Sequence, residues 1–264
     1  MKKWLKIVFG ILAFILMIVG IVYAQQKQSQ ATMNEPEIII RIKDENSLIS
    51  KEEVNEYLKI NDLFHAGMTF EQIDFDKIER ELKNMSQILD VKVYAQIGND
   101  WKINILQKKP IVRVFNSKNK SYYIDEFGSI IKSDVYHSSK VLVANGNITD
   151  DKRVFGSKSI INSDSLKTIS SLHQIYLISK YVCNNPFLSA QISQVYLRED
   201  GDFILVPQIG DQVIVFGTAH SESEIKRKFE KLSTFYKEGI TYEGWDKYKE
   251  INLKYSKQIV CKKK

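Results

Sequence analysis

Residues that could perform catalysis are few in this chain, and they do not form a recognisable active site. His220 comes just before Ser221 and Glu224, a combination of residue types that hydrolases use. A serine followed three residues later by glutamate is also the capping box that begins a helix, which explains this pair more simply. No two histidines have a metal-binding spacing among His65, His137, His173 and His220.

Other chemical patterns lead to the same conclusion. A phosphate-binding loop needs clustered glycines, whereas the glycines here stand singly at expected turns. Asp74 and Asp76 fit the N-cap and first turn of a helix. Asp150 and Asp151 stand beside two basic residues in an expected surface loop. We therefore expect no enzyme activity, no metal and no cofactor.

Aromatic side chains gather near the end of the chain, where Tyr242, Trp245, Tyr248 and Tyr255 follow one another closely. They either pack a terminal strand onto the preceding helix or form a binding surface, because aromatic residues dominate interface hot spots. The segment Lys249–Tyr255 alternates apolar and polar residues, which predicts a strand. A last strand can lie at a sheet edge, where unpaired amides and carbonyls accept a partner's strand. Both interpretations stay open on the residues alone.

The segment Ile7–Ala24 contains no charged residue. As a helix it spans about 27 Å, which nearly matches the hydrocarbon core of a bilayer. Trp4 and Tyr23 fall near the two interfaces, and the preceding lysines favour a cytoplasmic N-terminus. A cleaved signal peptide, cut after Ala24, is the alternative. The apolar stretch is longer than a typical signal core, which favours an uncleaved anchor.

The chain beyond the anchor predicts two folded regions of mixed α and β structure. The first has the order β-α-α-β-β, with strands at 38–42, 91–97 and 101–105 and helices at 50–58 and 74–84. The second is rich in strands and contains two helices. Its strands are expected at 111–115, 121–124, 129–132, 141–144, 192–198, 203–207, 212–216 and 249–255, and its helices at 163–182 and from a capping box at Ser221 onward.

Composition excludes some functions. The net charge is +6, but three lysines at each end of the chain account for it, and the charges between them balance. Nucleic-acid binding is therefore not expected. Cys183 and Cys261 are the two cysteines; they either pair in an oxidising compartment or remain separate thiols.

Three segments resemble the FtsQ/DivIB cell-division proteins. Gln107–Arg113 is similar to the family's basic residue and proline at the junction of its two domains. Tyr122–Gly128 resembles the strand and turn that open the second domain. The ending, Trp245–Lys262, is especially similar to the Bacteroidetes branch. The N-terminal tail is shorter than in many members, which leaves a cytoplasmic partner contact in doubt.

The resemblance implies an α+β protein with a single N-terminal transmembrane helix, a POTRA-like domain and a β-rich domain. It implies a non-enzymatic scaffold of the divisome, held in the inner membrane at the septum, with most of the chain in the periplasm. The expected domains are a cytoplasmic tail at 1–6, the transmembrane helix at 7–24, a tether at 25–36, the POTRA-like domain at 37–109 and the β-rich domain at 110–264.

The resemblance also implies partners, namely an FtsB/DivIC-type protein bound to an FtsL-type protein, and other divisome components. The expected binding residues are Trp245, Tyr248, Lys249, Glu250, Ile251, Asn252, Leu253, Lys254 and Tyr255. The alternative function is a periplasmic or secreted POTRA-containing chaperone of envelope assembly. Such proteins usually continue into a β-barrel, and the second region has too few strands for one.

Overall fold

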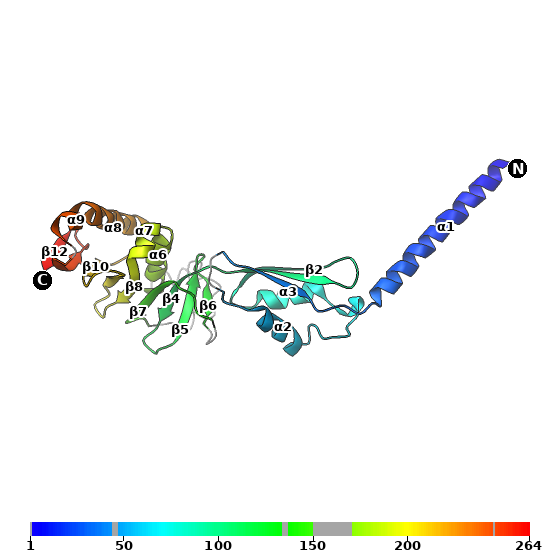
Figure 1. Ribbon diagram of the computed structural model, residues 1–264, viewed down its shortest axis with the longest axis horizontal. Helices are drawn as coiled ribbons and strands as arrows, with labels where there is room; N and C mark the ends of the chain where they lie inside the picture. Colours follow the sequence, from blue (N-terminus) through cyan, green and yellow to red (C-terminus); the bar gives the residue numbers. More distant parts are fainter. Residues whose placement is uncertain (1, 44–46, 134–136, 150–170, 245) are drawn as a thin grey trace. The chain divides into compact units, whose positions relative to one another are not determined.

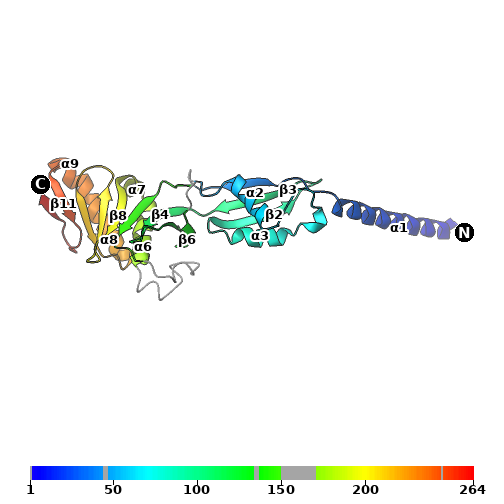
Figure 2. The same cartoon turned by 90° about the horizontal axis from the view of Figure 1, so that it is seen from below.

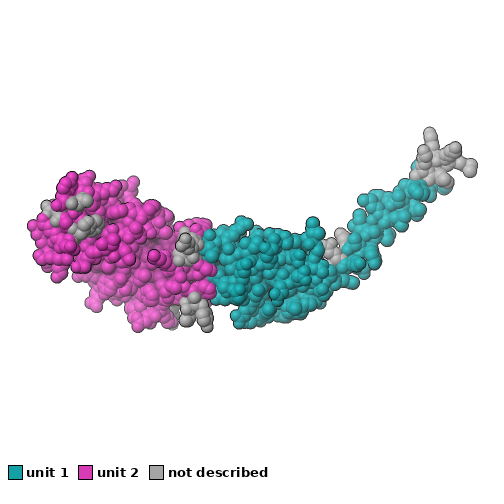
Figure 3. All heavy atoms as spheres, in the orientation of Figure 1, with its two compact units in different colours: residues 1–42, 49–107 teal, residues 43–48, 108–264 magenta. Residues whose placement is uncertain are grey.

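The computed structural model describes residues 2–43, 47–133, 137–149, 171–244 and 246–264. The chain divides into two compact units, coloured separately in Figure 3. Unit 1 contains residues 1–42 and 49–107, and unit 2 contains residues 43–48 and 108–264. Each unit has its own hydrophobic core, and each is described separately below.

The first element is the helix α1 (Lys2–Ser29), whose segment Ile7–Ala24 is long and apolar enough to cross a membrane. The helix continues beyond this segment through Ser29, and the chain then docks onto unit 1. Met33 donates its backbone N–H to the carbonyl of Met68 at 2.9 Å, and Asn34 donates its own to the carbonyl of Asn99 at 2.9 Å. The segment expected as a tether, 25–36, thus begins as the last residues of α1 and then forms hydrogen bonds with unit 1 at Met33 and Asn34.

Unit 1 has the predicted order β-α-α-β-β (Figure 1). Its sheet has the strand order β1-β3-β2, with β1 parallel to β3 and β2 antiparallel to it. The capping box at Ser50 and Glu53 is confirmed, and Asp74 caps the other α-helix by accepting the N–H of Lys77 at 2.8 Å. The elements are β1 (Glu37–Arg41), α2 (Lys51–Ile60), the 3-10 helix η1 (Phe70–Gln72), α3 (Phe75–Lys83), β2 (Ile88–Ala95) and β3 (Trp101–Gln107).

The core of unit 1 lies between its sheet and its helices. Alternate residues of β3, such as Ile103 and Ile105, are buried with Leu58 from α2 and Leu82 from α3. The strand predicted at 91–97 is shorter at its end than the alternating pattern indicates. The strand ends at Ala95 and the chain turns, so the side chain of Ile97 is fully exposed.

Unit 2 is built on one nine-stranded sheet with the order β12-β11-β10-β9-β8-β7-β4-β5-β6. The pairs β4/β7, β7/β8 and β10/β11 are parallel and the others antiparallel. Figure 2 shows β11 near one end of this sheet, where β12 is the outermost strand, and β6 at the other end. The strands are β4 (Pro110–Phe115), β5 (Ser121–Asp125), β6 (Ile130–Lys132), β7 (Leu142–Gly146), β8 (Ile192–Leu197), β9 (Phe203–Pro207), β10 (Val213–Gly217), β11 (Tyr248–Asn252) and β12 (Val260–Lys263).

Helices cover one face of the unit 2 sheet (Figure 1). The expected start of the first of them, at Ser163, lies outside the described residues. Asn185 and Pro186 do end this helix, but they also begin a short one that the sequence did not predict. Asn185 is its N-cap and Pro186 its first residue, the position where proline is favoured. The helices are α6 (Ser171–Cys183), α7 (Pro186–Gln191), α8 (Glu222–Thr234), the π-helix η2 (Phe235–Gly239) and α9 (Ile240–Glu243).

The main core of unit 2 joins this sheet to its helices. Phe203 and Phe216 from the sheet are fully buried with Phe229 from α8. The ring of Phe229 lies 4.9 Å from that of Phe216 and stacks on Tyr181 of α6 at 5.0 Å. Cys183 and Cys261 are both half-buried, and they form no disulfide with each other.

Candidate functional site

The predicted binding strand is not at the edge of its sheet. β11 pairs with β10 on one side and with β12 on the other. Leu253, just after β11, donates its N–H to the carbonyl of Val215 in β10 at 2.9 Å. Asn252 is in register with Val260 of β12. The prediction that Lys249–Tyr255 offers an open edge is therefore wrong, because its backbone groups are used inside the sheet.

The edge of the sheet is β12, and no strand pairs with its far side in the part of the chain that the structure describes. Lys264 donates its N–H to the carbonyl of Lys247 at 3.2 Å, so its backbone faces β11. In an antiparallel pair, successive residues face the partner strand alternately. Lys262 therefore also faces β11, while the N–H and C=O groups of Cys261 and Lys263 point away from the sheet.

The predicted binding residues have different environments. Ile251 and Leu253 are fully buried in the core of unit 2 and cannot reach a partner. Tyr248 is half-buried, with its ring 5.8 Å from that of Phe235 in the π-helix. Trp245 lies outside the described residues. The remaining predicted residues are exposed or half-buried: Lys249, Glu250, Asn252, Lys254 and Tyr255.

Two lysines hold the end of β11 in place. The ammonium of Lys231, on α8, donates to the carbonyls of Leu253, at 3.1 Å, and Tyr255. Burial, with the nearby positive charges of α8, holds the pKa of Lys231 below its usual value. Lys254 points elsewhere and forms an ion pair with Asp202 at 2.6 Å. The turn between β11 and β12 is thus fixed at its start by side chains from two other elements.

The start of α8 is fixed by an ion pair that is largely buried. Ser221 accepts the N–H of Glu224 at 3.2 Å, as predicted, but the Glu224 carboxylate accepts the N–H of His220 rather than that of Ser221. Glu224 also pairs with Lys228 at 2.6 Å. The Lys228 ammonium donates to the carbonyl of Thr218 at 2.7 Å and lies 5.0 Å from the centre of the Phe216 ring. Ser221 and Glu224 are therefore structural, as helix capping predicts.

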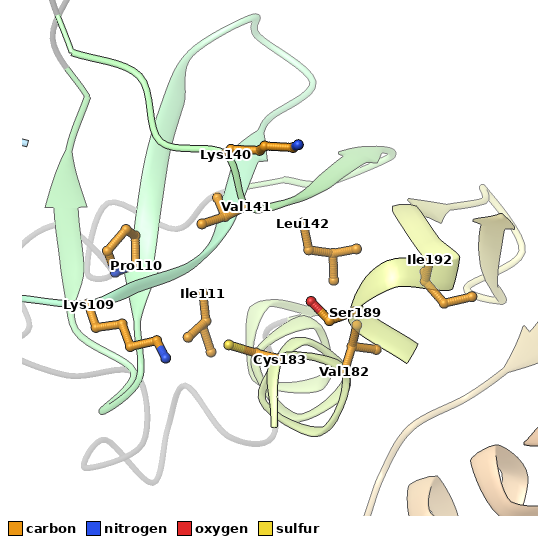
Figure 4. A pocket seen from close by; sticks show the side chains of 10 residues that line it. All are labelled: Lys109, Pro110, Ile111, Lys140, Val141, Leu142, Val182, Cys183, Ser189 and Ile192. Atoms are coloured by element: carbon orange, nitrogen blue, oxygen red, sulfur yellow. The ribbon is translucent and has the colours of Figure 1, made fainter. Parts of the chain in front are cut away.

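The hollow drawn in Figure 4 lies within unit 2 and is lined by lysines, apolar side chains, one cysteine and one serine. It has a volume of about 270 Å³ and lies where α6 and α7 meet the first residues of β4, β7 and β8. Cys183 and Ser189 line it together with lysines and apolar side chains. The described residues around it include no histidine or carboxylate that could activate a nucleophile. Across the described chain, no group of three or more His, Cys, Asp or Glu side chains could hold a metal.

The residues that the sequence did not single out are those of β12. A clue was present, because lysines are common on edge strands and the chain ends with Lys262, Lys263 and Lys264. The run Ile259-Val260-Cys261 before them is short, and alternation over three residues does not separate a strand from a loop. Which strands pair with each other also depends on tertiary structure, which local sequence patterns do not show.

Comparison with known proteins adds the family. The FtsQ/DivIB, C-terminal related model matches residues 109–262, and the POTRA-like domain model matches residues 34–106. No curated protein matches the chain. The first match covers more than half of the chain and most of unit 2, including β11, β12 and the helices that brace them. With a POTRA-like domain preceding that region, the chain belongs to the FtsQ/DivIB family.

Proposed function

We propose that this protein is a bitopic scaffold of the bacterial divisome that captures an FtsB/DivIC–FtsL-type pair by adding a partner strand to β12. Proteins of the family are membrane-anchored cell-division scaffolds, and α1 supplies one helix with the length and composition of a span. The POTRA-like unit would contact other division proteins and aid localisation to the septum. The outward-facing backbone of β12 is the observation that carries this proposal.

Strand addition suits the chemistry of this edge. Main-chain hydrogen bonds to Cys261 and Lys263 would supply affinity, and side chains on alternate faces would set the register. Val260 is 41% exposed, so one apolar side chain is available beside the bonding groups. The side chain of Cys261 packs against the core instead and holds the strand down. The Cys261 side chain would thus anchor β12 to the core, while the outward-facing backbone of the strand remains available to a partner strand.

Proline substitution at Lys263 tests this mechanism in the full-length protein. Lys263→Pro removes an N–H that faces away from the sheet, a position where proline is tolerated on an edge strand. Loss of one hydrogen bond, with steric obstruction by the ring, should weaken capture by about tenfold or more. Lys263→Ala loses the same side chain but keeps the N–H, so it should capture the pair clearly better than Lys263→Pro does. The measurement is copurification with the coexpressed FtsB/DivIC–FtsL-type pair.

Lys262→Pro is the matched control one residue away. Its N–H faces β11, so this variant should loosen β12 itself and increase hydrogen exchange in β11 and β12. Lys263→Pro should leave that exchange unchanged. Capture by Lys263→Pro equal to that by Lys263→Ala would rule out strand addition at β12.

Localisation tests the scaffold role separately from the binding mechanism. A fluorescent fusion of the full chain should gather at midcell, and depletion should produce filamentous cells. A uniform envelope signal with normal division on depletion would instead favour the chaperone function.

A further inference from the structure

The C-terminal end of the sheet carries a strong excess of positive charge. Residues 247–264 contain seven lysines and a single acidic residue, Glu250. The chain between the three N-terminal lysines and residue 247 carries a net charge of −3, so this excess is local. The lysines are Lys247, Lys249, Lys254, Lys257, Lys262, Lys263 and Lys264.

Only part of this charge is neutralised within the fold. Lys254 pairs with Asp202 at 2.6 Å, and Lys264 pairs with Asp211 at 3.2 Å. Lys262 is exposed and lies across the strand pair from Glu250, with no ion pair formed between them. Within the described residues, no ion pair involves Lys249, Lys257, Lys262 or Lys263. The outer strand therefore presents lysines that have no anionic partner in the described fold.

The lysines at the end of the chain lie on both faces of β12. Side chains of successive strand residues point to opposite faces. Val260, Lys262 and Lys264 thus share one face, while Cys261 and Lys263 share the other. A partner strand added to this edge would therefore find a lysine beside either face on which the partner carries its charged residues.

The same charge closes the edge to a second copy of this chain. Pairing of two β12 strands would bring Lys262 and Lys263 of one copy close to those of the other. Like charges facing each other across a strand pair are destabilising, and edge lysines are a common protection against such association. An edge that repels its own copy while offering backbone groups is selective for strands of opposite charge.

We propose that β12 selects an acidic partner strand, one that carries carboxylates at alternate positions and so along the face of either Lys262 or Lys263. This inference rests on the proposed function, because it names the chemistry of the strand that β12 accepts. Carboxylates in that strand would neutralise the unpaired lysine on the face that they share when the two strands pair. Because the side chains are exposed, their attraction would weaken as salt screens it.

Three synthetic peptides test this proposal against the full-length protein in detergent. The first alternates valine and glutamate over eight residues, the second has glutamine in place of glutamate, and the third has lysine there. Binding is measured by fluorescence anisotropy at low and high salt. We expect the glutamate peptide to bind about tenfold more tightly than the glutamine peptide at low salt, with most of the difference lost at high salt. The lysine peptide should bind least.

Charge reversal on the protein provides the matched comparison. Lys262→Glu with Lys263→Glu should reverse the preference, so that the lysine peptide binds more tightly than the glutamate peptide. Lys118→Glu with Lys120→Glu changes the net charge equally at exposed positions beside the β4–β5 turn, and it should leave the preference unchanged.

The outcomes distinguish this inference from the proposed function. Equal binding of the glutamate and glutamine peptides, with both weakened by Lys263→Pro, would overturn acid selection and leave strand addition standing. A preference that the Lys118→Glu and Lys120→Glu variant also lost would overturn the assignment to β12. Binding of none of the three peptides would overturn the proposal.

Discussion

At the level of single residues, two carboxylates of unit 2 are held in opposite electrostatic environments. Asp125, in the turn that the resemblance singled out, is fully buried. Its Oδ1 accepts the N–H groups of Phe127 at 2.9 Å and Ser129 at 2.7 Å, which fixes the turn. Its Oδ2 is buried with no hydrogen-bond partner in the described structure. Burial raises the pKa of Asp125 above its ordinary value despite those two hydrogen bonds.

Asp125→Asn should change the pH dependence of stability. A raised pKa means that the folded state favours the protonated acid, so this contribution is complete below about pH 4 and is lost as pH rises. Asparagine keeps the Oδ1 acceptor and does not titrate. The free energy of unfolding of wild type relative to the variant should therefore fall by on the order of 1 kcal/mol between pH 4 and pH 7. Urea unfolding at several pH values measures it, and a constant difference would contradict the argument.

Glu224 should show the opposite dependence. Burial opposes its ionisation, but Lys228 and the N–H of His220 outweigh it and hold its pKa below the ordinary value. Its contribution is therefore present above about pH 4.5 and is lost as pH falls. Glu224→Gln leaves the Lys228 ammonium, which is 5% exposed, without its anion and should cost about 2–3 kcal/mol at pH 7. Adding Lys228→Met should restore part of that loss, and equal stability of the single and double variants would argue against a buried-charge penalty.

At the level of elements, the junction of β7 and β8 depends on a glycine. Gly146 has φ of 101°, and a Cβ there would lie 2.2 Å from the carbonyl oxygen of Leu197. That oxygen accepts the N–H of Asn147 at 2.8 Å, so the strands cannot separate without losing a hydrogen bond. The close approach is between backbones, where no side chain can rotate away.

Gly146→Ala should therefore cost about 3 kcal/mol or more, whereas Gly201→Ala should cost only about 1 kcal/mol. Gly201 has a similar φ of 85°, but a Cβ there meets nothing within 4 Å. The comparison separates the steric clash from the backbone strain. Thermal or urea unfolding of the two variants measures both, and equal losses would show that the clash is relieved by small shifts.

Local signals in the sequence predicted most elements but not their neighbours in the sheet. The cap at Ser50 and the alternation of β3 depend on residues close in the chain, and both are confirmed. The position of β11 depends on a parallel pairing with β10 across the intervening α8 and on the short strand β12. Neither pairing has a local signature in the sequence. The sequence therefore predicts the open edge at β11, whereas the edge strand is β12. The exposure of Ile97 has a similar cause, because alternation continues into the turn while the strand does not.

At the level of the whole molecule, α1 is the element that would determine on which side of the membrane the two folded units lie. The segment Ile7–Ala24 is a candidate span, and lysines at positions 2, 3 and 6 precede it. From the positive-inside rule we expect those lysines to lie in the cytoplasm and everything after the span to lie outside it. Partner capture at β12 and contacts of the POTRA-like unit would both take place on that outer side.

Two single-cysteine proteins test this orientation, and they separate an anchor from a cleaved signal peptide. Both lack the native thiols through Cys183→Ser and Cys261→Ser; one carries Lys2→Cys and the other Ile97→Cys, at the fully exposed turn of unit 1. A membrane-impermeant maleimide should label Ile97→Cys in cells whose outer envelope is permeable, and Lys2→Cys only after lysis. The inverse pattern would overturn the orientation. Because Lys2 precedes the span, a label at Lys2→Cys appears on the mature protein only if the N-terminus is intact. Cleavage after Ala24 would remove the labelled cysteine from the mature protein. It would also remove the membrane attachment that the scaffold function requires.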